Sequence, residues 1–143
     1  MANAPPNCPY CGSEPVLKEA EEIYGKPYGR VWVCSKWPEC SALVSCHRHT
    51  SRPMGTLANS ELRKLRHRTH EVFDYWWQAY TTWQRPKAYS VLAHAMGMTR
   101  KECHIGLMNE QQCKRVIELC TREDKYIGKE QVSEGREGEA ADV

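Results

Sequence analysis

The sequence predicts a small α+β protein, and three features support this fold class. Two cysteine pairs lie near the N-terminus, Cys8 with Cys11 in a CxxC spacing and Cys34 with Cys40. Short runs rich in β-branched and aromatic residues separate the pairs, which favours a β-hairpin. Residues 61–84 instead carry apolar side chains at helical spacing. We therefore expect a small β unit with a metal site, then a mainly helical region containing one long amphipathic helix and a C-terminal helical bundle.

The β unit is predicted over residues 7–50. Its two β-prone runs, PVLKEAEEIYG and GRVWVCS, are separated by GKPYG, whose glycines and proline indicate a turn. Residues 51–59 are rich in proline, glycine and small polar residues and are predicted to be a linker. Asn59 or Ser60 then provides a cap for the next helix.

The helical region is predicted over residues 60–120. Its long first helix, residues 61–84, ends before Pro86 because proline disfavours helical geometry in the preceding residue. A second helix is predicted over residues 87–97, and a third over residues 109–120 begins with the capping-box pattern Asn-x-x-Gln. Two arrangements of this end remain open: a helix-turn-helix, or a bundle that covers the tryptophans of the long helix.

The last segment, residues 121–143, is predicted to be an acidic, disordered tail. It carries four basic and seven acidic side chains, a net charge of −3, with almost nothing apolar after Ile127. Residues 1–120 carry sixteen basic and eleven acidic side chains, a net charge of +5. A zinc ion bound by four thiolates would subtract two from that charge. The remaining net charge is small, so the prediction of a nucleic-acid partner depends on where the charges lie along the chain.

Cys8, Cys11, Cys34 and Cys40 are the predicted ligands of one structural zinc ion. Zinc prefers a tetrahedron of soft or borderline ligands, and a CxxC turn places two sulfurs on one side while a hairpin returns with two more. Free core thiols and disulfides are the alternatives, and a reducing cytosol disfavours disulfides. Because four thiolates leave no open position for an activated water, we expect the metal to hold the fold.

Two sequence motifs around these cysteines resemble a known kind of zinc ribbon. CPYCGS followed by VWVCSKWPEC is similar to the ribbons at the C-terminal end of type IA DNA topoisomerases. The resemblance implies binding of single-stranded DNA, and it makes Trp32, Lys36 and Trp37 candidate nucleic-acid contacts. The alternative is that the two tryptophans pack under the ribbon, which has little other core.

A longer resemblance covers roughly residues 7–120. The chain is similar to an uncharacterised zinc-finger-containing family of phages and bacteria, whose pattern includes VxxH, PxGTLA, ELRxxRxxxHxxFD and CHIG. All four motifs occur here, beginning at Val44, Pro53, Glu61 and Cys103. The resemblance implies that the ribbon and the helices form one evolutionary unit, and it implies no particular activity.

The first half of the long helix is basic on its polar side. Arg63, Lys64 and Arg66 are the residues that we predict to follow a phosphate backbone, with release of counterions. A solvated helix face with no ligand is the alternative. The ribbon next to this helix in the sequence brings the phosphate interpretation level with this alternative.

A second metal site or an acid/base pair is a further hypothesis. His70 and Asp74 are four residues apart, on one face of the long helix, and His47 follows the ribbon. Imidazole and carboxylate groups suit zinc and similar ions. The same spacing is common on solvated helices, where it carries no function.

The favoured function is binding of nucleic acid, single-stranded or irregular DNA first, without catalysis. A phage-type adaptor that binds a host protein is the alternative, and a metal-dependent hydrolase or nuclease is the second alternative. No apolar run approaches the roughly 20 residues that span a bilayer, and the N-terminus lacks the order of a secretory signal. We expect no membrane contact and a cytoplasmic location, which is the host cytoplasm if a phage encodes the protein.

Overall fold

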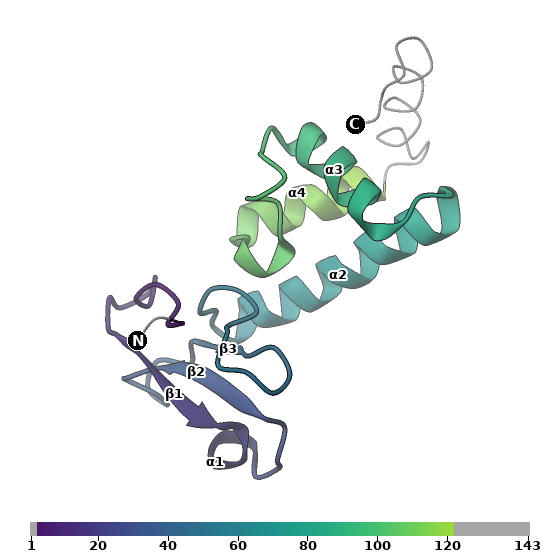
Figure 1. Cartoon of the computed structure of the whole chain (residues 1–143). Helices are drawn as coiled ribbons and strands as arrows, with labels where there is room; N and C mark the ends of the chain where they lie inside the picture. Colours follow the sequence, from purple (N-terminus) through teal and green to yellow (C-terminus); the bar gives the residue numbers. More distant parts are fainter. Residues whose placement is uncertain (1–2, 122–143) are drawn as a thin grey trace. The chain divides into compact units, whose positions relative to one another are not determined.

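The computed structural model describes residues 3–121 and divides the chain into two compact units, residues 1–64 and 65–143 (Figure 1). The division falls inside α2 (Ser60–Tyr80), and each unit is described by itself. The acidic tail predicted from residue 121 lies outside the described residues, apart from Thr121. Within residues 3–121, no helix is both long and apolar enough to cross a membrane. The fold class is α+β, as predicted.

The first unit contains a three-stranded antiparallel sheet in the order β1-β2-β3. Its strands are β1 (Pro15–Glu19), β2 (Arg30–Cys34) and β3 (Leu43–Ser45). Pro15 pairs with Cys34 at one end of the β1–β2 ladder, and Glu19 pairs with Arg30 at the other. β1 and β2 lie within the two runs predicted as β-prone, and β3 extends the predicted hairpin.

The second half of the first predicted run is helical. Residues Ala20–Tyr24 form α1, although the sequence predicts a β-prone run through Tyr24. Glu19 and Glu22 form a capping box at its start, and Gly25 ends it in the left-handed conformation, with φ of 74°. These local signals outweigh the β-propensity of the run, so the chain turns back after five extended residues.

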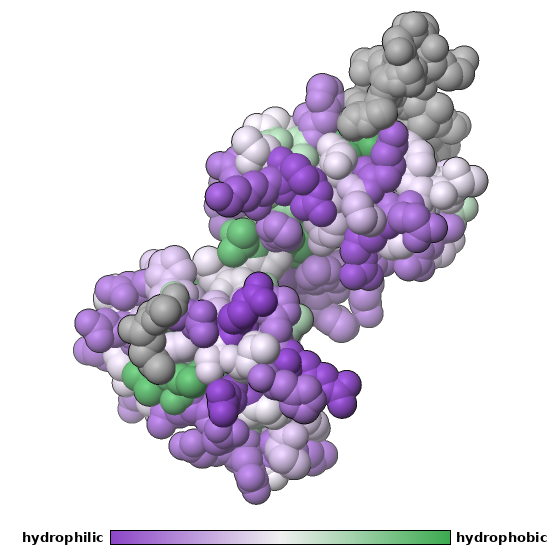
Figure 2. Space-filling view, in the orientation of Figure 1, coloured by the Kyte–Doolittle hydropathy of each residue, from purple (hydrophilic) through white to green (hydrophobic). Residues whose placement is uncertain are grey.

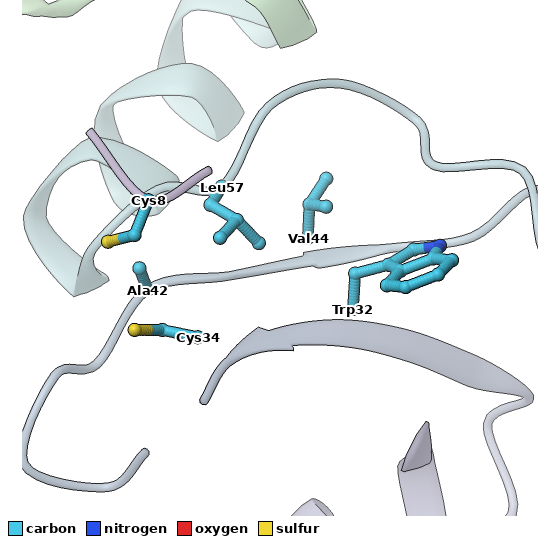
Figure 3. Close-up of a cluster of buried hydrophobic side chains, with 6 residues drawn as sticks. All are labelled: Cys8, Trp32, Cys34, Ala42, Val44 and Leu57. Carbon is cyan, nitrogen blue, oxygen red and sulfur yellow. The ribbon is translucent and has the colours of Figure 1, made fainter. Parts of the chain in front are cut away.

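Side chains of β2 alternate between the two faces of the sheet, as the pleat requires. Trp32 and Cys34 point into one cluster, and Val31 and Val33 into another. The first cluster consists of Cys8, Trp32, Cys34, Ala42, Val44 and Leu57. Figure 3 shows Cys8 and Cys34 at one end of it and Trp32 at the other. Both faces of β2 are therefore buried, and one of them leads directly to the cysteines.

The segment predicted as a linker belongs to the folded first unit. Pro53 forms an isolated bridge with Cys46, and Ala58 forms one with Leu43. Leu57 is buried in the first core cluster. The bridges pair this segment with β3 and the residue after it, and Leu57 packs on one face of the sheet. Asn59 Oδ1 then accepts the backbone N–H of Leu62 at the start of α2.

The second unit contains the rest of α2 together with three further elements. These are α3 (Arg85–Met96), the short 3-10 helix η1 (Ile105–Leu107) and α4 (Glu110–Cys120). Phe73 lies at the centre of an aromatic core, with its ring centroid 4.6 Å from that of Tyr89 and 6.0 Å from that of Trp76. Cys113 and Cys120 are buried thiols of this unit.

The helix boundaries follow the caps that the sequence supplies. α4 begins with the predicted capping box, in which Asn109 and Gln112 exchange side-chain to backbone hydrogen bonds. Gly97 ends α3 in the left-handed conformation. α2 ends at Tyr80, four residues before the predicted end at Gln84. Pro86 lies in the first turn of α3, a position that suits proline, so the chain leaves α2 earlier to begin this new helix.

Candidate metal centre

The first two cysteines lie on a tight turn before β1. The backbone N–H of Gly12 donates to the carbonyl of Cys8 at 2.9 Å, and the N–H of Cys8 donates to the carbonyl of Ser13 at 2.8 Å. Gly12 has a φ of 78°, a left-handed conformation that suits glycine. The turn brings Cys8 and Cys11 to the same side of the chain.

The second pair is held by the loop between β2 and β3. Cys34 is the last residue of β2, and its carbonyl accepts the N–H of Trp37 at 2.9 Å. The N–H of Cys40 then donates to the carbonyl of Lys36 at 3.0 Å. Two consecutive turns therefore fold the five intervening residues and return Cys40 towards Cys34.

All four sulfurs meet at one point of the first unit. The Sγ atoms of Cys8, Cys11, Cys34 and Cys40 all lie within 4.8 Å of one another. Cys8 and Cys40 are 3.6 Å apart, and Cys11 and Cys34 are 3.4 Å apart. A tetrahedron with zinc–sulfur bonds of about 2.3 Å has sulfurs about 3.8 Å apart. The arrangement therefore fits a zinc ion bound by four thiolates.

The four thiols have different surroundings, which change their pKa values in different directions. Burial raises the pKa of the Cys34 thiol to about 12 and also raises the pKa of Cys8. Hydrogen bonds from the side chain and backbone of Ser13 lower the pKa of Cys11 to about 6. A divalent cation supplies the positive charge that lets all four be thiolates together.

These residues fit one structural zinc ion. Four protein ligands close the tetrahedron, so no position remains where a bound water would be activated. The zinc would join the turn before β1 to the end of β2 and to the loop before β3. Among residues 3–121, these cysteines are the only group of three or more candidate ligands that lie together.

The three residues predicted from the ribbon resemblance have different environments. Trp32 is 1% exposed, and its Nε1–H donates to the carbonyl of Ser51 at 2.7 Å. It belongs to the core, so in this structure no face of its ring is available for a base. Trp37 is half-buried and packs against the second core cluster, whereas Lys36 is exposed. Of these three residues, only Lys36 has a fully exposed side chain that a ligand can reach.

The three basic residues predicted on the long helix also have different environments. Nη1 of Arg63 donates to the carbonyls of Ser41 and Ala58 at 2.6 and 2.7 Å, which ties the start of α2 to the first unit. Arg66 is buried in the second unit, where Nε and Nη2 both donate to the carbonyl of Met108. Lys64 is exposed. Two of the three side chains are therefore committed to structural hydrogen bonds.

Replacing Arg66 by alanine is expected to lower the free energy of unfolding of the second unit by about 2–3 kcal/mol. The change removes two hydrogen bonds from a charged donor. The buried carbonyl of Met108 then lacks both of these donors. Urea unfolding followed by circular dichroism measures the effect. Arg68→Ala is the control, because Arg68 is an exposed arginine on the same helix and its loss should change stability by less than about 0.5 kcal/mol. Equal effects of the two changes would show that Arg66 is not a structural residue.

The proposed second site remains a prediction. His47 belongs to the first unit and the other two residues to the second. Asp74 accepts the Nε1–H of Trp77 at 2.9 Å and forms an ion pair with Arg85 at 3.5 Å. Desolvation lowers the pKa of His70, while Asp74 acts in the opposite direction. Asp74 thus already has structural partners within its own unit.

Some exposed residues of the first unit lie outside the set predicted from the sequence. They are Tyr24 and Tyr28 on and after α1, and Arg48 and Arg52 in the loop after β3. One sequence signal marks the second pair, because residues 40–60 contain no aspartate or glutamate. The exposure of the tyrosines follows only from the position of α1.

Comparison with known proteins identifies one relationship. No curated protein and no solved structure matches the chain. The sequence model of a family described as a zinc-finger-containing domain matches residues 4–123. This segment includes all four cysteines and the helices α1 to α4. The resemblance to topoisomerase ribbons stays a prediction. The match covers most of the sequence and agrees with the four-sulfur cluster, and the chain therefore belongs to this zinc-finger-containing domain family.

Proposed function

We propose that the protein binds nucleic acid, single-stranded or irregular DNA first, through its first unit, and that its zinc ion holds the fold. One observation carries the proposal: residues 40–60 expose cations and contain no acidic side chain. Phosphate groups release counterions when cations neutralise them, so such a surface favours a polyanion. The closed coordination sphere supports a structural role for the metal.

The cations are presented by a hydrogen-bonded loop, residues 47–52, which we call the basic loop. The N–H of His47 donates to the carbonyl of Arg52 at 2.8 Å, and the N–H of Thr50 donates to the carbonyl of His47 at 3.0 Å. His49 has a φ of 62°, which lets the chain reverse at the tip. Arg48 and Arg52 are exposed. Their guanidinium groups are therefore held on a fixed backbone, which reduces the entropy lost on binding.

The local arrangement matters because the net charge of this unit is small. Residues 1–64 carry eight basic and six acidic side chains. Four zinc-bound thiolates bring the net charge from +2 to about zero. Long-range attraction by net charge would thus be weak, and affinity would depend on cations that approach the phosphates directly.

Replacing Arg48 and Arg52 together by alanine is expected to weaken binding of a fluorescently labelled oligothymidylate. For single strands, log K falls with log salt by about 0.7 for each phosphate neutralised. The double change should therefore reduce this slope by about 1.4. Fluorescence anisotropy titrations at several salt concentrations measure both quantities on the zinc-loaded full chain.

Two charge-matched variants complete the experiment. Lys101→Ala with Lys114→Ala removes two exposed cations of the second unit and should leave the slope unchanged. Lys36→Ala with Lys64→Ala tests the exposed cations predicted from the sequence alone. Absence of binding by the native chain at low salt would overturn the proposed function. If the Arg48/Arg52 and Lys101/Lys114 double changes had equal effects, the basic loop would not be the binding surface.

A protein-binding adaptor remains the alternative function. On the face in view in Figure 2, hydrophobic residues form only small separate patches within each unit. Stable protein interfaces usually have a core enriched in aromatic and apolar groups. The patches on this face therefore do not favour the adaptor over the polyanion.

A further inference from the structure

Two exposed tyrosines lie at the end of the sheet that is remote from the metal site. The register places Cys34 opposite Pro15 at the metal end, and Arg30 opposite Glu19 at the remote end. α1 follows Glu19 directly, and the chain from α1 to Arg30 carries both tyrosines. Figure 1 shows α1 beyond the arrowhead of β1, away from the start of that strand.

The basic loop leaves from the same end of the sheet. The N–H of Cys46, just after β3, donates to the carbonyl of Arg30 at 3.1 Å. Nη1 of Arg30 donates to Ser51 Oγ at 2.9 Å, and Ser51 also accepts the indole N–H of Trp32. These bonds join the segment that follows Tyr28 to the basic loop.

The tyrosines form a pair of accessible rings. Tyr24 is 46% exposed and Tyr28 is 66% exposed, with ring centroids 6.0 Å apart and planes tilted by 57°. Gly25 and Gly29, both at positive φ, shape the turn that carries Tyr28. The N–H of Ala20 donates to the carbonyl of Gly29 at 2.6 Å, which closes this turn onto α1. The rings are thus presented by a short, hydrogen-bonded segment.

The charges around the rings balance each other, because residues 18–30 carry three basic and three acidic side chains. Lys26 and Arg30 lie two residues on either side of Tyr28, and both are exposed. Of the nearby acids, Glu19 forms an ion pair with Arg30 at 3.5 Å, and Glu22 forms one with Lys18 at 3.9 Å. Glu21 of α1 is exposed as well. The excess of positive charge therefore comes from the basic loop, whose cations have no acidic neighbour in sequence.

We propose that Tyr24 and Tyr28 form a stacking platform for the unpaired bases of a single strand whose phosphates lie along the basic loop. This inference rests on the proposed function and specifies its ligand. Every base has a π-face, so stacking on an aromatic side chain requires an unpaired base and tolerates any sequence. A duplex keeps its bases stacked on each other and offers the platform only phosphates. The base-contacting surface then lies at the opposite end of the sheet from the zinc. Trp32 is buried in the core, and Trp37 is half-buried against the second core cluster.

The test compares three ligands of equal length: oligothymidylate, an abasic oligonucleotide and a DNA duplex. Tyr24→Leu and Tyr28→Leu should each weaken binding of oligothymidylate roughly fivefold or more. Binding of the abasic strand should not change, because it retains phosphates and lacks bases. Tyr75→Leu is the matched control, since Tyr75 is a similarly exposed tyrosine of the second unit.

The outcomes separate this inference from the proposed function. If the Arg48/Arg52 variant weakens binding and the tyrosine variants do not, the stacking platform is wrong and the proposed function stands. If the duplex binds as tightly as oligothymidylate, the platform is also wrong. If no oligonucleotide binds and the exposed tyrosines are instead protected by a protein partner, both proposals fail.

Discussion

Replacing Cys34 by serine is expected to abolish stoichiometric zinc binding and to unfold the first unit. Cys34 is buried, ends β2 and lies 3.4 Å from the sulfur of Cys11. Serine supplies no thiolate, and an incomplete ligand set binds zinc far more weakly. In small zinc-finger peptides the metal contributes on the order of 10 kcal/mol or more to folding. Elemental analysis for zinc and near-ultraviolet circular dichroism of the five tryptophans measure the loss.

Cys46→Ser is the matched control for this change. Cys46 is a half-buried cysteine of the same unit that does not belong to the four-sulfur group. The control should keep one zinc per chain and its near-ultraviolet spectrum. A chelator added to the native chain should reproduce the effect of Cys34→Ser, while the helical signal of the second unit persists. Retention of one zinc ion by the Cys34→Ser variant would contradict the assignment of ligands.

The dependence on zinc follows from how little apolar material the first unit contains. Its two buried clusters comprise ten residues, most of them small or medium in size. Domains of this length bury a smaller fraction of their surface than larger domains do, and natural ones often add a metal or disulfides. Two of the ten are ligands themselves, so the same side chains close the metal site and complete the core.

The metal site could be predicted because its determinants are local in sequence. A CxxC turn with glycine after it, and two cysteines around a five-residue loop, need only one antiparallel pairing to meet. The caps at Asn59, Gly97 and Asn109 were predictable for the same reason, since each depends on a few neighbouring residues. Helical periodicity also located the long helix, apart from its last turn.

The candidate contacts were harder to predict because they depend on tertiary packing. A strand that is buried on both faces shows no polar side, so the pattern VWVC does not reveal whether Trp32 points to solvent. Arg66 lies on the basic side of the sequence pattern, yet its long side chain reaches a carbonyl 42 residues away. α1 and its exposed tyrosines required knowledge of where the chain reverses after β1.

Replacing Trp32 by alanine is expected to lower the free energy of unfolding of the first unit by about 3–5 kcal/mol, because it leaves a large cavity in the first core cluster. Trp32→Phe should cost less, since an aromatic ring still fills much of the space. It removes the hydrogen bond to the carbonyl of Ser51 and so costs about 1–3 kcal/mol. Urea unfolding at saturating zinc measures both changes.

The affinity for oligothymidylate distinguishes packing from recognition at this position. Under conditions where the Trp32→Phe protein is fully folded and zinc-loaded, its affinity should equal that of the native chain, because the ring is buried. A fully folded, zinc-loaded Trp32→Phe protein that loses affinity about fivefold, as expected for a lost stacking contact, would place Trp32 at the ligand. Tyr28→Leu in parallel should show the reverse, with native stability and reduced affinity, because its ring lies on the surface.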